Sequence, residues 1–289
     1  MESIWVGLLG GEVRQRFIDA GGIRTRALES GDGGVPLIFL HGAGGHAEAY
    51  SRNLLAHGKH FHTYAIDMVG HGFTDRPDLG YQLDDYVDHL HSFIDAIGAK
   101  TVMLSGESLG AMVTIRFVNR YPERVAKAVL NTGMLGGRDE KGRQEVRDAL
   151  ERSRAAAGSL TREAVRKRLE WLMYEPEKSV TEELIDIRYK IYTQPGMGAT
   201  VRKIADVVFG TALEPNPSGQ WDPAQMGNIK CPTLVLWSRH NPGRSVEIAR
   251  ESAKIIPNHK MVVLENSAHW PQWEEIEAFN RYHLDFLTA

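Results

Sequence analysis

Short apolar runs rich in β-branched residues recur along the first half of the chain, separated by glycine turns and by segments of helix length. Continuous apolar runs are typical of parallel strands that are buried on both faces of a sheet. Their alternation with helical segments predicts an α/β architecture, in which helices cover both faces of a mostly parallel sheet. The predicted strands are "PLIFLHG" (36–42), "HTYAIDM" (62–68), "TVMLSG" (101–106) and "VAKAVLNTG" (125–133), preceded by a hairpin of "RQRFIDA" and "IRTRALES" around Gly21 and Gly22.

The pattern changes between about Leu135 and Met226. Charged, amphipathic segments with helical spacing replace the strands there, including "RDEKGRQEVRDALERSRAAAG" and "TREAVRKRLEWLMYE". The strand pattern returns with "CPTLVLWS" (231–238) and "KMVVLENSAH" (260–269). We therefore predict a helical insertion over residues 135–226, within a core built from residues 1–134 and 227–289.

The composition narrows the possible partners. Of 289 residues, 42 % are hydrophobic and 25 % charged, and the formal net charge of -3 leaves no basic face for nucleic acid. Cys231 is the only cysteine, which excludes an intramolecular disulfide and a cysteine-based zinc site and favours a reducing compartment. The apolar run near the amino terminus is too short for a signal peptide or a membrane span. We expect a cytoplasmic protein with a small-molecule partner, and neither nucleic acid nor a membrane.

The segment "SGESLGAM" places a serine between two glycines where a predicted strand ends and a helix begins. In such a turn the chain reverses so tightly that a Cβ at either glycine would collide with neighbouring backbone. Ser108 would then stand clear of the sheet at the helix amino terminus, where backbone dipoles favour a developing negative charge. The spacing Gly106, Ser108 and Gly110 predicts a catalytic nucleophile.

A glycine-rich loop and a late histidine complete the expected machinery. The loop "FLHGAGGHAEAY" (39–50) follows an earlier strand, and we expect the amide of Ala43 to bind an oxyanion together with that of Leu109. The loop lacks the Gly-Lys-Ser/Thr ending of a phosphate-binding loop and the spacing of a dinucleotide fingerprint. His269, just after the last predicted strand, follows the nucleophile in the order required of a catalytic base.

With these landmarks in order, the chain resembles the α/β-hydrolase superfamily over nearly its whole length. The resemblance implies an eight-stranded, mostly parallel sheet with a helical lid. The stretches "HGAGGHAEAYSRN", "AIDMVGHGFTDRP", "LMYEPEKSVTEELIDIRY" and "SAHWPQWEEIEAFN" are similar to the meta-cleavage product hydrolases, which cut a carbon–carbon bond in ring-fission products of aromatic compounds.

This resemblance implies roles for particular residues. Ser108 and His269 would be catalytic, Trp270 would form a pocket wall, and Asn53 and Arg188 would contact the enol and carboxylate end of the substrate. A guanidinium on a lid helix can hold a carboxylate through two parallel hydrogen bonds. Water would be the second nucleophile, and no metal or organic cofactor is implied. We also expect a homodimer or a higher homo-oligomer.

Two positions depart from the pattern of those hydrolases. They commonly carry an asparagine before the nucleophile and a Gly-Arg-Asp-Asp type run after the seventh strand, whereas this chain has Glu107 and the run Ser238-Arg239-His240-Asn241. Asn241 thus occupies the place of the catalytic acid. Its amide oxygen can accept from the imidazole N–H, but it cannot stabilise an imidazolium with a full charge, and the equivalent replacement in a serine protease costs ~10⁴ in turnover.

Three explanations for Asn241 stay open. The acid could come from another strand end, where only Asn131, Asp139 and Glu140 are near; the substrate could be activated enough for a weaker base; or the chain could be a slow enzyme or a binding protein. In the pocket, Glu107 would either pair with a base such as Arg188 or indicate a substrate that presents a neutral donor; alternatively, it would point away beneath the turn. The alternatives to carbon–carbon hydrolysis are a carboxylesterase or lactonase, and a weakly catalytic ligand-binding protein of the same fold.

Overall fold

The computed structural model describes residues 2–133, 139–159, 161–213 and 222–289. In this part of the chain eight strands form one sheet, in the order β1-β2-β4-β3-β5-β6-β7-β8. The first two neighbouring pairs of strands are antiparallel and the others are parallel. The strands are β1 (Arg14–Ala20), β2 (Ile23–Ser30), β3 (Leu37–Leu40), β4 (Thr63–Ile66), β5 (Val102–Glu107), β6 (Val125–Asn131), β7 (Thr233–Ser238) and β8 (His259–Leu264).

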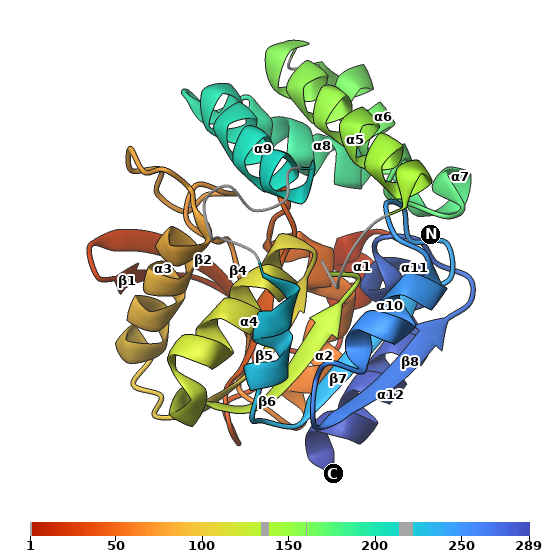
Figure 1. The fold of residues 1–289 in the computed structure, drawn as a ribbon. Helices are drawn as coiled ribbons and strands as arrows, with labels where there is room; N and C mark the ends of the chain where they lie inside the picture. The colour runs from red at the N-terminus through yellow and green to blue at the C-terminus, as the bar shows by residue number, and fades with distance from the viewer. Residues whose placement is uncertain (1, 134–138, 160, 214–221) are drawn as a thin grey trace.

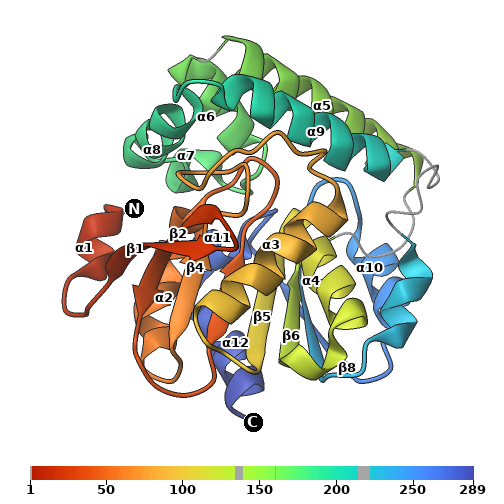
Figure 2. The same ribbon diagram turned by 90° about the vertical axis from the view of Figure 1, so that its left-hand side faces the viewer.

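Helices cover both faces of this sheet, as Figures 1 and 2 show. Successive strand residues point to opposite faces, so each strand feeds two separate cores. Ile38 and Leu40 of β3 pack with the helices of one face, whereas Leu37 and Phe39 pack with those of the other. The helices of the first face are α3 (Leu83–Ala96), α4 (Leu109–Arg120) and α10 (Val246–Ala253); those of the second are α1 (Ile4–Leu8), α2 (Ser51–Gly58), α11 (Pro271–Glu274) and α12 (Ile276–Thr288).

The remaining five helices form what we call the helical layer, which lies across one edge of the sheet at the top of Figures 1 and 2. Thr161 and Thr181 cap two of them by accepting hydrogen bonds from the amides of Ala164 and Leu184. The helices of the layer are α5 (Glu140–Ser159), α6 (Arg162–Glu170), α7 (Pro176–Ser179), α8 (Glu182–Tyr192) and α9 (Met197–Leu213). Short 3₁₀ turns span Ala47–Tyr50, Pro122–Arg124 and Pro223–Asn228.

The loops that follow β3, β5, β6, β7 and β8 meet under the helical layer. Residues from all five loops line one pocket, whose opposite wall comes from α5, α6, α8 and α9. Ligands of open parallel sheets bind at the carboxyl ends of the strands. The candidate site therefore lies between the sheet edge and the helical layer.

Candidate active site

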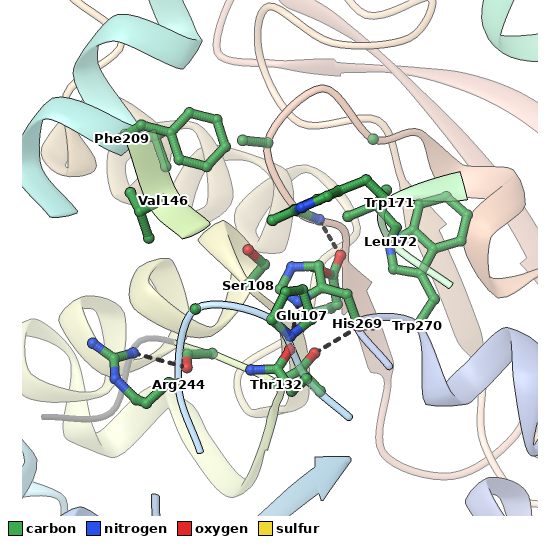
Figure 3. A pocket seen from close by; sticks show the side chains of 18 of the residues that line it. Glu107, Ser108, Thr132, Val146, Trp171, Leu172, Phe209, Arg244, His269 and Trp270 are labelled. Atoms are coloured by element: carbon green, nitrogen blue, oxygen red, sulfur yellow. Dashed lines mark hydrogen bonds and ion pairs between the residues drawn. The ribbon is translucent and has the colours of Figure 1, made fainter. Parts of the chain in front are cut away.

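Ser108 lies in a strained turn between β5 and α4. Its φ of 53° and ψ of −110° place it in a region that side-chain-bearing residues seldom adopt. A Cβ at Gly106 would collide with the carbonyl oxygen of Gly110, and a Cβ at Gly110 would collide with that of Leu40. Small residues are therefore required on both sides of Ser108, whose side chain lines the pocket (Figure 3).

His269 follows β8 and is held by contacts on three sides. Its Nδ1 lies 2.7 Å from Oδ1 of Asn241, which follows β7. Its carbonyl accepts a hydrogen bond of 2.9 Å from the Thr132 hydroxyl, and its amide donates one of 2.8 Å to the carbonyl of Leu172, beyond α6. Because the amide oxygen of Asn241 accepts, Nδ1 carries the proton and the free position on the ring is Nε2.

Glu107 is fully buried and turns its carboxylate into the pocket, next to His269 (Figure 3). Oε2 accepts a hydrogen bond of 2.6 Å from the amide of Gly42, and Oε1 lies 3.0 Å from Nε2 of His269. Oε1 has no hydrogen-bond partner, so this contact is a close approach of the carboxylate to the imidazole and not a hydrogen bond. The suggestion that Glu107 points away beneath the turn is therefore wrong.

The partners of Glu107 also differ from the expectation. The described residues include no ion pair between Glu107 and Arg188, because the carboxylate is engaged by Gly42 and His269 instead. Within the same part of the chain, Ser108 makes no side-chain hydrogen bond to His269. In this arrangement the carboxylate of Glu107 lies beside Nε2 of His269, the nitrogen that would serve a serine nucleophile.

Two backbone amides face the space beside Ser108. Ala43 lines the pocket, and Leu109 begins α4, where the first amides of a helix have no partner within the helix. Across the described chain neither amide donates a hydrogen bond. Their role as oxyanion donors stays a prediction.

Two arginines of the helical layer line the same pocket, and both are almost completely buried. Arg188 of α8 is 1 % exposed, its Nε and Nη2 have no hydrogen-bond partner, and its guanidinium lies 5.1 Å from the ring centre of Trp270. Arg168 of α6 is 6 % exposed, its Nη1 has no partner, and it lies 4.9 Å from the ring centre of Trp171. Burial lowers the pKa of both guanidinium groups, that of Arg168 to about 10. Both remain charged at neutral pH.

Asn53 does not contribute to this pocket, contrary to the expectation drawn from the resemblance. It is fully buried in α2, and its Nδ2 donates to the carbonyl of Gln272 at 3.2 Å and to Oδ1 of Asn280 at 2.8 Å. These bonds join α2 to α11 and α12 on one face of the sheet. The side chain therefore has a structural place outside the pocket lining, and this arrangement does not support the predicted contact with a substrate enol.

The other acid candidates near β6 do not reach His269. Asn131 donates from Nδ2 to Oε1 of Gln272 at 2.8 Å. Asp139 accepts from the amide of Gly142, and Glu140 pairs with arginines on its own helix. In the described ranges Asn241 is the residue at Nδ1 of His269, which removes the explanation that an acid comes from another strand end.

The described residues hold no cluster of three or more histidine, cysteine, aspartate or glutamate side chains suited to a metal ion. Among the same residues no helix is long and apolar enough to cross a membrane.

A family model described as "alpha/beta hydrolase fold" matches residues 35–276 of the chain. The chain belongs to this family. As in other members of the alpha/beta hydrolase fold, its serine turn follows a central strand, and the histidine follows the last strand of the sheet.

Relatives within this hydrolase fold family carry informative names. A 2-hydroxy-6-oxo-2,4-heptadienoate hydrolase of Pseudomonas putida is 29 % identical over 284 residues, which cover 95 % of this chain and 96 % of that protein. A 2-hydroxy-6-oxononadienedioate/2-hydroxy-6-oxononatrienedioate hydrolase of Burkholderia vietnamiensis is 28 % identical over 92 % of this chain and 91 % of its own. A solved meta-cleavage product hydrolase of Pseudomonas fluorescens superposes with a TM-score of 0.79 at 27 % identity, covering 94 % of this chain and 97 % of that one. The resemblance to meta-cleavage product hydrolases is thereby confirmed.

The sequence also held a signal for a pocket residue that was missed. Val165, Arg168, Leu169 and Leu172 follow the spacing of one helical face, and the three apolar members are buried. An arginine on the apolar face of an amphipathic helix in this hydrolase fold points inward, toward the pocket. The high charge of the whole segment obscures this one position, because most of its charged residues do not line the pocket.

Proposed function

We propose that the chain is a serine-dependent hydrolase that cleaves a carbon–carbon bond in a ring-fission product, a vinylogous 1,5-diketone carrying a carboxylate. One observation carries the proposal: Ser108 in its strained turn shares a closed pocket with His269, Trp270 and the unpaired guanidinium of Arg188. The names of the relatives support the same class of substrate. The helical segment 135–226 would act as a lid over this pocket.

The residues support a reaction in two halves. After the dienol ketonises, the Ser108 oxygen attacks the distant carbonyl while its proton passes to Nε2 of His269, and the amides of Ala43 and Leu109 stabilise the oxyanion. The bond between that carbon and its neighbour toward the carboxylate then breaks, and His269 returns a proton to the carbon that leaves. Water, activated by His269, hydrolyses the acyl group from Ser108.

The neutral Asn241 fits this class of substrate. It orients His269 without charge support, so the enzyme has a weaker base than a full triad provides. A dienol that ketonises before cleavage supplies its own electron sink, which lowers the demand on the base. Arg188 would hold the carboxylate and so fix the carbonyl beside Ser108.

The first test is hydrolysis of 2-hydroxy-6-oxo-2,4-heptadienoate, followed by the loss of dienolate absorbance. We expect turnover by the parent and a loss of at least about 10³-fold in Ser108→Ala and His269→Ala, because removal of either member of the unit stops acyl transfer. Asn53→Ala is the matched control outside the pocket and should keep the parent rate per folded molecule. Equal rates in the parent and in Ser108→Ala would contradict a serine-dependent mechanism.

A carboxylesterase or lactonase is the second candidate, because Asn53 lies outside the pocket lining and the carboxylate of Glu107 faces the pocket. An activated neutral ester distinguishes the two. A burst of product followed by turnover faster than on any dienoate would favour the esterase, whereas tight ligand binding without turnover would favour a binding protein.

We also propose that the protein is cytoplasmic and acts as a homodimer or a higher homo-oligomer. The lone buried cysteine, Cys231, suits a reducing compartment. The exposed Phe17 on edge strand β1 and the exposed Trp5 of α1 offer apolar surface to a second copy. Light scattering after gel filtration tests the assembly, and a monomer at micromolar concentration would contradict it.

A further inference from the structure

The pocket contains more positive charge than a single carboxylate can balance. Arg168 and Arg188 both line it, both are nine-tenths buried or more, and each has guanidinium nitrogen atoms without a hydrogen-bond partner. A buried guanidinium without a partner is costly, and removing it from water is favourable only when an anion pairs with it. Each of these groups is therefore built to receive an anion.

The acidic groups of the pocket do not offset these charges. Among the described residues that line it, Glu107 is the sole carboxylate, and it contacts His269 and the amide of Gly42. The single carboxylate of Glu107 can offset at most one of the positive charges. Arg244, the third arginine of the lining, donates to the carbonyl of Gly133. Arg168 and Arg188 are therefore the two arginines whose unpartnered nitrogen atoms are left for the ligand.

We propose that Arg168 is a second carboxylate-binding residue and that the substrate is a ring-fission product with two carboxylates, one at each end. Arg188 holds the carboxylate next to the enol, and Arg168 holds the distant one. The inference rests on the proposed function, because it specifies the substrate of the same site. A guanidinium is suited to this task because its planar fork binds a carboxylate through two parallel hydrogen bonds.

The test compares two substrates of equal length: 2-hydroxy-6-oxononadienedioate and the monoacid 2-hydroxy-6-oxononadienoate. Both can form the same dienolate, so a difference between them reports the distant carboxylate alone. We expect the parent to prefer the diacid by at least about tenfold in kcat/KM, since a hydrogen bond to a charged group is worth about that factor or more. Equal kcat/KM values on the two substrates would overturn the proposal.

Substitutions distinguish the role of Arg168 from that of Arg188. Arg168→Met should lower kcat/KM about 10- to 100-fold on the diacid, mainly through KM, and less than about threefold on the monoacid. Arg188→Met, the matched control, should impair both substrates. Arg168→Lys should recover part of the preference for the diacid, because it keeps the charge and loses the fork. An equal loss on both substrates in Arg168→Met would show a structural role and overturn the proposal.

A binding measurement tests the second carboxylate site separately from the proposed hydrolysis. Calorimetric titration of Ser108→Ala with each acid measures binding without turnover. Tighter binding of the diacid, lost when Arg168→Met is added, supports the second carboxylate site even if the parent hydrolyses neither compound. Equal affinity for the two acids overturns it. The melting temperature of Arg168→Met should equal or exceed that of the parent, because replacing an unpaired buried charge by an apolar side chain relieves its burial cost.

Discussion

At the scale of single residues, the imidazole of His269 has an amide side chain at one ring nitrogen and a carboxylate side chain at the other. Asn241 contacts Nδ1 and Glu107 contacts Nε2. The resemblance seen in the sequence implied the opposite pattern, with an asparagine before the nucleophile and an acid after the seventh strand. In this chain the carboxylate lies at Nε2 of His269 instead, in the pocket that Ser108 also lines.

This arrangement predicts that Asn241→Asp alone does little. An imidazole between two carboxylates would keep its proton and would be a poor base, so we expect less than about a threefold change in kcat on an activated ester. Adding Glu107→Asn removes the second carboxylate and frees Nε2 for Ser108. The double variant should then exceed the parent by at least about tenfold, toward the gain that a charged third member gives in serine hydrolases.

A double-mutant cycle measures this coupling directly. We expect an interaction free energy of at least about 1.4 kcal/mol, which corresponds to one factor of ten in rate. Additive effects would mean that Glu107 and Asn241 act on His269 independently. A large gain from Asn241→Asp alone would mean that Glu107 does not restrict the base.

Local patterns in the sequence were sufficient to predict the serine turn and the late histidine. A strand followed by two flanking glycines identifies the turn, and the order along the chain identifies the histidine. They were insufficient where the decisive contact joins distant segments. Asn53 finds its partners more than 200 positions away, at Gln272 and Asn280, and nothing near it in the sequence indicates them. The contact of Glu107 with His269 joins two positions 162 apart, and whether a side chain before the nucleophile enters the pocket depends on the opposing loops.

At the scale of elements, the turn from β5 to α4 stores strain at Ser108. A side-chain-bearing residue at its φ and ψ costs about 1–3 kcal/mol and persists only where the surroundings enforce it. Here β5 lies between β3 and β6 in the sheet, and the close approach of Gly110 to β3 leaves the turn no alternative course.

A substitution that relieves the strain at Ser108 should raise the free energy of unfolding. Ser108→Gly should raise the free energy of unfolding by about 1 kcal/mol, because the strain relieved exceeds the extra entropy of an unfolded glycine. Ser108→Ala keeps a Cβ and is the matched control, with little expected change. Urea unfolding of the three proteins checks this, and a less stable Ser108→Gly would indicate that the turn is not strained.

The elements themselves were predicted well where a run is long and apolar. Arg14–Ala20 and Ile23–Ser30 form the expected hairpin. Strands β3 to β8 lie within the predicted apolar runs, except that β5 ends one residue after its run and β8 begins one residue before its run. The order of the strands in the sheet was not predicted, since apolar runs alike in composition do not specify their neighbours. The division of the chain into a core and a lid stays a prediction.

At the scale of the whole molecule, several histidines are buried without charge. Burial lowers the pKa of His57 and His71 to about 4, and it also lowers the pKa of His41, His89 and His283. Nε2 of His57 in α2 lies 3.0 Å from Nδ1 of His283 in α12, and Nε2 of His283 contacts the Ser105 hydroxyl of β5. These rings serve as core residues that require neutrality.

Stability should therefore fall on acidification. Between the ordinary histidine pKa of about 6.5 and the folded value of about 4, the unfolded chain binds more protons, so the free energy of unfolding rises with pH in this window. We expect His57 and His71 each to cost about 2 kcal/mol at pH 5 relative to pH 7.5. Urea midpoints across this range measure the slope.

A single substitution measures how much one histidine contributes to the pH dependence of the free energy of unfolding. His57→Gln should flatten the pH dependence by about 2 kcal/mol, whatever its stability at neutral pH, whereas His240→Gln, at an exposed position, is the matched control and should leave the slope as it is. An unchanged slope in His57→Gln would show that this ring does not take up a proton on unfolding.

The hydrogen bond from the amide of His269 to the carbonyl of Leu172 joins the base to the segment after α6. Arg168, Trp171 and Leu172 come from the same stretch of chain and line the same pocket. The side chains that we propose to select a ligand and the backbone that positions His269 therefore belong to one segment of the chain. A chimaera that exchanges only the helical layer between relatives would alter reactivity along with selectivity, and successful grafts should carry the loop around His269 with them.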